Sequence, residues 1–166
     1  MARKFDLYGQ LTSKITDKDF LHGYIDGVVS CAYVDVIINI LTCIWNMIDF
    51  VDETNPMNRL VKKIPTDLKA LDDLLKKSST TFYYDQPEPT IADYFVLEAF
   101  LASKDYCVKL LPTKDDRQAL EKLEKTMKER PALADYFNRG LLYKRFSGSP
   151  KEAEYMAKLA ETYTES

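Results

Sequence analysis

One short stretch of the chain carries a hydroxyl and a carboxylate at a spacing that either catalysis or helix architecture can use. Thr90 and Asp93 lie three positions apart, directly before an apolar run that begins at Tyr94. This is the pattern of a capping box, in which the Thr90 oxygen accepts from the amide of the third helical residue and the Asp93 carboxylate accepts from the Thr90 amide. We interpret the pair as a structural cap, and removing either partner should cost about 0.5–2 kcal/mol.

The other reactive side chains form no recognisable catalytic or metal-binding set. His22 is the only histidine, and Cys31, Cys43 and Cys107 lack the paired spacing of a tetrahedral site, so no metal is expected. The sequence has neither a nucleophile elbow nor a glycine-rich phosphate loop. We interpret the cysteines as buried, reduced thiols of a cytosolic protein.

Two pairs of neighbouring carboxylates, Asp72-Asp73 and Asp115-Asp116, lie in charged surroundings. We interpret them as solvated helix faces or as partners of a helix dipole in a first turn.

The composition and charge of the chain limit the classes of partner that it is expected to bind. The chain has 166 residues, 46% of them hydrophobic, which fits one compact domain with its own core. The 23 basic and 26 acidic residues are spread along the chain, so no nucleic-acid or membrane partner is expected. The first residues are not typical of a secretory leader, and a cytoplasmic location is expected.

Apolar residues recur at spacings of three and four, which predicts an all-α bundle of about six helices. The expected helices run from Thr16–Asp19, with Thr16 as cap, towards Phe50; from Pro56 to a loop over 78–89; from Thr90 to about Ser103; from about Lys114 to Glu129; from Pro131 to Gly140; and from Ser149–Glu152 to about Tyr163. Pro65 is expected to kink or break the second helix after Lys63.

The first helix is unusual because apolar residues occupy most of its circumference from Val28 to Ile44. A central Asp35 is costly in a bilayer, so we interpret this helix as buried within a soluble protein. Such a helix must be covered on nearly all sides. The cover is either the rest of the bundle or a partner subunit, another domain or an apolar ligand.

Four motifs, in order and spacing, resemble the C-terminal helical domain of cytosolic glutathione transferases, with the alpha, pi, mu and sigma classes most similar. The motifs are Phe5–Gly9, Tyr24–Gly27, Thr90–Asp93 followed by Glu98, and Arg130–Leu133. The resemblance covers nearly the whole chain. It implies a helical domain over residues 16–166, preceded by a linker remnant over residues 1–15.

Enzymes of that family conjugate glutathione to electrophiles in detoxification, and a preceding thioredoxin-like domain binds glutathione and supplies the catalytic residue. The resemblance begins at Ala2–Phe5, so that domain is expected to be absent from this chain. No catalytic residue is assigned. The chain alone is expected to be inactive, with glutathione as co-substrate only where the missing domain is present.

The resemblance also implies candidate site residues. Ser30 takes the position of an aspartate that, in alpha and pi enzymes, reaches the glutathione of the neighbouring subunit. Tyr33, Val36, Ile37 and Ile40 take positions that line the hydrophobic-substrate pocket. Tyr155 and Met156 fall in a tail similar to the lid helix of the alpha class. The pocket and lid positions are equally well explained as core residues.

Two functions remain open at this stage. The chain is either the helical domain of a transferase, which contributes the hydrophobic-substrate side of the site and dimer contacts, or a stand-alone protein-interaction module. Helical domains of this family dock partners in translation-elongation and synthetase complexes. A non-catalytic carrier of apolar small molecules is a third possibility.

Overall fold

The computed structural model describes residues 8–9, 16–46, 54, 58–106, 110–138, 154–155 and 157. These residues contain helices and no strand, as the sequence predicts. The helices are α1 (Lys18–Ser30), which continues through a π-helical segment (Cys31–Ile38) into α2 (Asn39–Trp45), then α3 (Asn58–Lys76), α4 (Ile91–Tyr106), α5 (Gln118–Lys128) and α6 (Pro131–Asn138).

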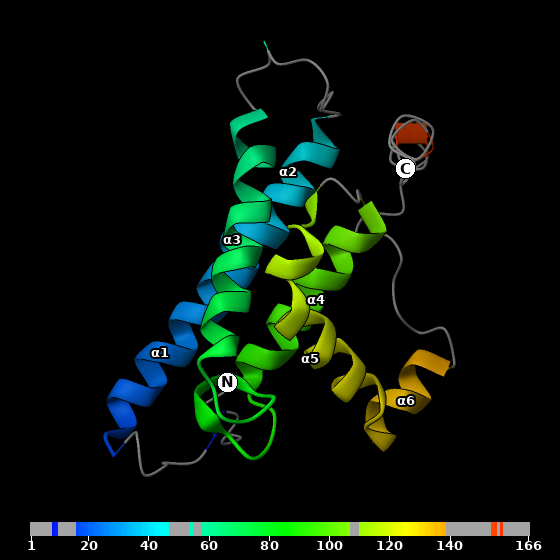
Figure 1. Cartoon of the computed structure of the whole chain (residues 1–166). Coiled ribbons are helices and arrows are strands. Elements are labelled where there is room, and N and C mark those ends of the chain that lie inside the picture. The colour runs from blue at the N-terminus through cyan, green and yellow to red at the C-terminus, as the bar shows by residue number, and fades with distance from the viewer. Residues whose placement is uncertain are drawn as a thin grey trace.

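The long helix formed by α1, the π-helical segment and α2 runs diagonally through the domain, and α3 and α4 pack against it (Figure 1). α5 packs on α3 and α4, and α6 extends the bundle from α5. One core cluster joins these helices. Its fully buried large side chains include Ile25, Ile40, Ile64, Leu68, Leu71, Tyr83, Phe100, Leu120 and Leu123.

The π-helical segment keeps one stripe of the long helix in the core. Val28, Ala32, Val36 and Ile40 are all buried and follow one another at intervals of four. In an α-helix each step of four turns the side chain by about 40°, so the stripe would drift around the helix. A π-helix turns less per residue, which offsets the drift.

Asn39 stabilises the return from the π-helical segment to α2. Its backbone amide donates to the carbonyl of Val36, and its side-chain Nδ2 donates to the Asp35 carbonyl at 2.6 Å. The side chain thus supplies the Asp35 carbonyl with the donor that an α-helix would provide from the Asn39 backbone.

The ends of the long helix differ from the sequence prediction. Asp17, rather than Thr16, is the cap, because its Oδ1 accepts from the amides of Asp19 and Phe20 at 2.8 and 3.2 Å. At the other end α2 stops at Trp45, short of the predicted Phe50, and residues 47–50 lie outside the described residues.

Of the two outcomes predicted at Pro65, the break is wrong, since α3 runs unbroken from Asn58 to Lys76, and the kink stays a prediction. An internal proline costs about 3 kcal/mol through the lost amide donor. Ile64, Leu68 and Leu71 are fully buried around it, and each buried aliphatic side chain contributes about 1.5–3 kcal/mol. Burial of the apolar face therefore outweighs the defect.

The later boundaries follow the predictions with local shifts. α4 begins directly after Thr90, whereas a separate 3₁₀ turn over Lys114–Asp116 precedes α5 and delays its start to Gln118. Pro131 opens α6 as predicted. Gly140 lies outside the described residues, as does most of the predicted last helix, although residues 154, 155 and 157 are helical.

By length and composition alone, the helix from Lys18 to Trp45 is apolar enough to cross a membrane. Core helices of soluble proteins meet the same criterion. Here one stripe of the helix packs in the core, and its Asp35 pairs with Lys63 of α3 at 3.0 Å. The absence of a membrane partner stays a prediction.

Candidate functional site

Thr90 and Asp93 form a buried hydrogen-bonded pair at the start of α4. The Asp93 Oδ2 accepts from the Thr90 amide at 2.7 Å, as a capping box requires. The other half differs from the expected geometry, because the Thr90 hydroxyl donates to the same oxygen at 2.9 Å instead of accepting from an amide. The Asp93 amide donates to the Thr90 carbonyl at 3.1 Å.

Asp93 also holds the loop that precedes α4. Its Oδ1 accepts from the backbone amide of Tyr83 at 3.1 Å, ten residues upstream. Burial raises the pKa of Asp93 to about 6, although the hydrogen bonds from Thr90 and Tyr83 act in the opposite direction. The Asp93 carboxylate therefore has a structural role, because it accepts hydrogen bonds both from the loop and from the start of the helix.

Three of the motifs that carry the family resemblance meet in space beside α1. The Tyr8 hydroxyl donates to Asp26 Oδ1 at 2.6 Å. Gly9 follows with φ +86°, and a Cβ there would clash with the side chains of Gln86 and Thr90. Segments distant in sequence thus converge, and the glycine is required by both its backbone conformation and the close approach.

The interpretation of Asp72 as solvated is wrong. Its side chain is fully buried on α3, where Oδ1 accepts from the backbone amide of Leu120 at 2.9 Å and Oδ2 pairs with Lys76 at 2.7 Å. Asp73 is the exposed member of the pair and forms a surface ion pair with Lys69 at 2.7 Å. Asp72 is therefore a buried hydrogen-bond acceptor, whereas its sequence neighbour Asp73 is an ion-pair partner at the surface.

The structure separates the candidate substrate residues into two groups. Val36, Ile37 and Ile40 are buried in the core cluster, and Tyr155 is also buried. Met156 lies outside the described residues.

Ser30 and Tyr33 are the exposed members of the predicted set, about one turn apart. The Tyr33 ring meets Phe95 of α4 edge-on, with ring centroids 5.8 Å apart. An aromatic corner therefore lies at the surface between the long helix and α4. Whether these residues contact glutathione or an electrophile stays a prediction.

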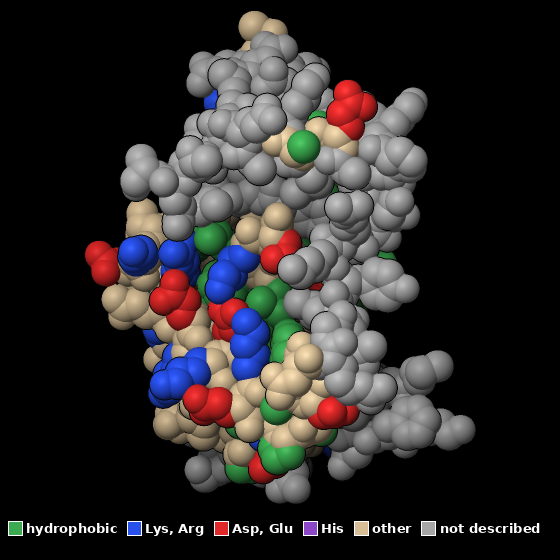
Figure 2. All heavy atoms as spheres, turned by 90° about the vertical axis from the view of Figure 1, so that its right-hand side faces the viewer, with side chains coloured by type: hydrophobic (Ala, Val, Ile, Leu, Met, Phe, Trp, Pro, Cys, Tyr) green, Lys and Arg blue, Asp and Glu red, His purple; other side chains and the backbone are tan. Residues whose placement is uncertain are grey.

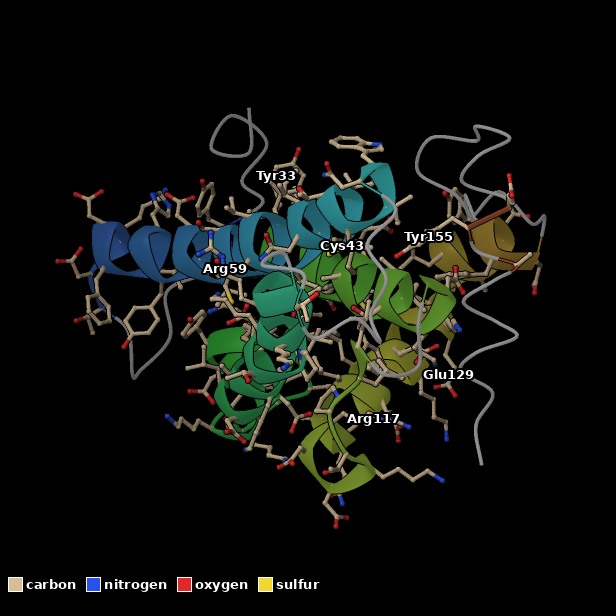
Figure 3. All side chains as sticks on the ribbon, turned by 90° about the horizontal axis from the view of Figure 1, so that it is seen from above. Tyr33, Cys43, Arg59, Arg117, Glu129 and Tyr155 are labelled. Atoms are coloured by element: carbon tan, nitrogen blue, oxygen red, sulfur yellow. The ribbon has the colours of Figure 1, made fainter. Side chains whose placement is uncertain are left out.

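The long helix has a second apolar face that the described domain leaves uncovered. Tyr33, Val34 and Trp45 are 46%, 50% and 62% exposed. The half-buried Ile38 and Leu41 lie between Val34 and Trp45 at spacings of four, three and four, so these residues form one stripe. In Figure 3, Tyr33 points away from the other labelled side chains of the bundle. We call this set, Tyr33, Val34, Ile38, Leu41 and Trp45, the outer stripe.

Charges of both signs are mixed on the surface. On the described part of the face shown in Figure 2, acidic and basic side chains alternate around small apolar areas. Lys104 and Lys128, for example, both pair with Glu124, at 2.8 and 2.6 Å. Within the described ranges, no group of three or more His, Cys, Asp or Glu side chains could hold a metal ion.

Comparison with known proteins identifies one family. A family model described as glutathione S-transferase, C-terminal domain, matches residues 35–140. No curated protein sequence matches the chain closely enough to indicate common ancestry.

Proposed function

Because the chain belongs to the glutathione S-transferase C-terminal domain family, we propose that it supplies the apolar side of an electrophile-binding site and a contact surface for another subunit or domain. The observation that carries this proposal is the outer stripe, which is apolar and exposed on the longest helix. Contiguous apolar surface of this kind is typical of interaction and ligand sites. The parent activity is conjugation of glutathione to electrophiles, in a cytoplasmic protein.

The aromatic corner of Tyr33 and Phe95 is the proposed electrophile-facing part. Two rings at right angles offer an incoming aromatic molecule both a face and an edge, which are the preferred geometries of aromatic contacts. Val36 and Ile40, on the same helix as Tyr33, are buried in the core and are not part of this exposed corner. Ser30, one turn away, is the proposed donor to a glutathione carboxylate.

The chain alone is not expected to catalyse conjugation. The described residues contain no strand, whereas the thioredoxin-like unit that binds glutathione requires a sheet. Cys31 and Cys43 are poor nucleophiles, since burial raises the pKa of each thiol to about 11. The proposed contribution is therefore binding and positioning of the electrophile.

Trp45 provides a direct test, because it is the only tryptophan of the chain and lies on the outer stripe. We would titrate the chain with 1,3-dinitrobenzene, an unreactive aromatic, and follow absorbance-corrected quenching of Trp45. Tyr33→Ser should weaken binding several-fold because it removes the ring that meets Phe95. Tyr136→Ser, which removes an exposed ring from α6, is the matched control and should bind like the wild type.

Two outcomes would contradict the proposal. One is a titration of Tyr33→Ser that overlays the wild type. The other is glutathione conjugation of 1-chloro-2,4-dinitrobenzene by the purified chain, since that activity would require a complete site within these residues.

The second candidate function is a stand-alone interaction module. The exposure of Val34 and Trp45 favours it, because these residues lie on the outer stripe beyond the aromatic corner and are available to a partner protein. In this case the domain would associate through the stripe without binding an electrophile. Tyr33→Ser would then affect association, and dinitrobenzene would quench the exposed Trp45 only by collision, without saturation and equally in both proteins.

A further inference from the structure

A separate groove lies near the N-terminal end of the long helix, at the C-terminal end of α3. It has a volume of about 270 Å³, and its lining includes Phe20, Tyr24, Leu74, Lys77, Tyr84 and Asp85. Tyr24 and Tyr33 are nine residues apart, which is about 14 Å along a helix. The groove is therefore distinct from the outer stripe and does not rest on the function proposed for it.

Three aromatic rings form one wall of the groove. The rings of Phe20 and Tyr24 have centroids 4.6 Å apart, and those of Tyr24 and Tyr84 are 4.7 Å apart in an edge-to-face contact. Phe20 and Tyr24 are 54% and 41% exposed, so apolar ring surface faces solvent. This surface suits a flat aromatic partner.

The backbone at Tyr84 is strained. Tyr84 has φ 60° and ψ 40°, and Asp85 has φ 59°, so two consecutive non-glycine residues are left-handed. For a bulky side chain this conformation is an outlier, and such outliers cluster at ligand sites. The strain places the Tyr84 ring against Tyr24, whose carbonyl accepts from the Tyr84 hydroxyl at 3.4 Å.

The two charged side chains that line the groove, Asp85 and Lys77, differ in the hydrogen bonds they make. Asp85 Oδ1 accepts from the amide and the hydroxyl of Ser79 at 2.5 and 2.6 Å, so its charge is already solvated by donors of the loop. Lys77 is exposed, and its ammonium has no hydrogen bond or ion pair with any residue in the described part of the chain. Lys77 is thus the charge available to a ligand.

A cationic ligand fits this arrangement poorly. Aromatic cages for ammonium groups hold the cation over open ring faces. Here the rings are in contact with one another at 4.6 and 4.7 Å, which leaves no space between them, and the nearby ammonium of Lys77 would repel a cation.

We propose that this groove binds a small aromatic carboxylate, with the aromatic rings on Tyr24 and Tyr84 and the carboxylate on Lys77. The volume lies just below the range of about 300–1,000 Å³ that is usual for small-molecule sites, which favours a ligand of one or two rings. Tyr84 is the specificity-determining residue, because its strained backbone positions the ring that completes the wall.

The test compares 2-naphthoate with its uncharged isostere 2-naphthamide, by titrations of the whole chain followed in ¹H–¹⁵N correlation spectra. The amides of residues around Tyr24, Lys77 and Tyr84 should shift with 2-naphthoate. Lys77→Gln should weaken naphthoate binding about two- to fivefold, as expected for an exposed ion pair, and leave naphthamide binding unchanged. Lys125→Gln, at an exposed position of α5, is the control.

Tyr84→Gly separates loss of the ring from loss of the fold, since glycine adopts positive φ without strain. This variant should stay folded and bind both ligands several-fold more weakly. The proposal is overturned if 2-naphthoate does not bind, if Tyr84→Gly binds as well as the wild type, or if Lys77→Gln affects the acid and the amide equally.

Discussion

The buried carboxylate of Asp72 on α3 accepts a hydrogen bond of 2.9 Å from the backbone amide of Leu120, the third residue of α5. Arg117, at the cap position of α5, offers no side-chain acceptor. The helix end is therefore capped from another helix, 48 residues away in sequence. Since Asp72 also pairs with Lys76, one carboxylate couples the start of α5 to its packing on α3.

Replacing this cap should destabilise the domain. Asp72→Ala removes a charged acceptor and leaves the Leu120 amide unpaired, which should lower the free energy of unfolding by about 2 kcal/mol. Asp73→Ala removes only a surface ion pair with Lys69 and should cost at most about 1 kcal/mol. Urea denaturation of both variants measures the difference. Equal losses would show that the interhelical cap contributes nothing of its own.

Asp93 should make stability fall between about pH 4 and pH 6. The pKa of Asp93 is raised from 3.8 to about 6 in the folded protein, mainly by burial. In this range the folded state binds the proton more strongly than the unfolded state, so stability declines as pH rises, by about 3 kcal/mol for this group.

Denaturation of wild type and Asp93→Asn from pH 3.5 to 7 isolates that contribution, because asparagine does not titrate. The difference in unfolding free energy between the two proteins should change across the range and level off above about pH 6. A constant difference would mean that Asp93 titrates as an ordinary carboxyl.

Two glycines should respond oppositely to alanine. Gly9→Ala forces a Cβ into Gln86 and Thr90 at a φ of +86° and should destabilise the domain by about 1–3 kcal/mol. Gly23 lies in α1 with nothing within 4 Å of an added Cβ, so Gly23→Ala should stabilise the domain by about 1 kcal/mol. Thermal melting measures the direction of both changes in stability. A lower melting temperature for Gly23→Ala would contradict the placement of Gly23 in an open position of a helix.

Cys43 should react slowly with thiol reagents. Burial raises the pKa of the Cys43 thiol to about 11, so at pH 8 its thiolate fraction is at least about a hundredfold below that of an ordinary cysteine. Iodoacetamide labelling with site-resolved mass spectrometry measures the rate in native and urea-unfolded protein. Similar rates in the two states would contradict the burial.

Local signals predicted most of the fold. Apolar periodicity gives the helices, and the Thr90–Asp93 pair marks the start of α4, because each pattern acts within a few residues. Asp72 has no such signature, since its partner Leu120 is distant in sequence. The continuity of α3 through Pro65 is not predictable locally, because a local rule cannot weigh the burial of Ile64 and Leu68.

The candidate site is less predictable than the fold, because it depends on contacts between helices that local patterns do not report. Periodicity shows that the long helix is apolar on several sides but not which side α3 and α4 cover, so Val36 and Ile40 could not be separated from Tyr33. Nothing in the local sequence signals a left-handed tyrosine, and the groove at Tyr84 was therefore missed.

The central claim is that the outer stripe is a contact surface for a second copy of the chain, and sedimentation velocity over a range of concentrations tests it most directly. We expect the wild-type chain to associate as its concentration rises. Val34→Asp, which places a charge on the stripe, should remain monomeric with an unchanged circular dichroism spectrum, while Tyr136→Asp on α6 should associate like the wild type. A wild-type chain that stays monomeric at every concentration, or a Val34→Asp variant that associates equally well, would contradict the account.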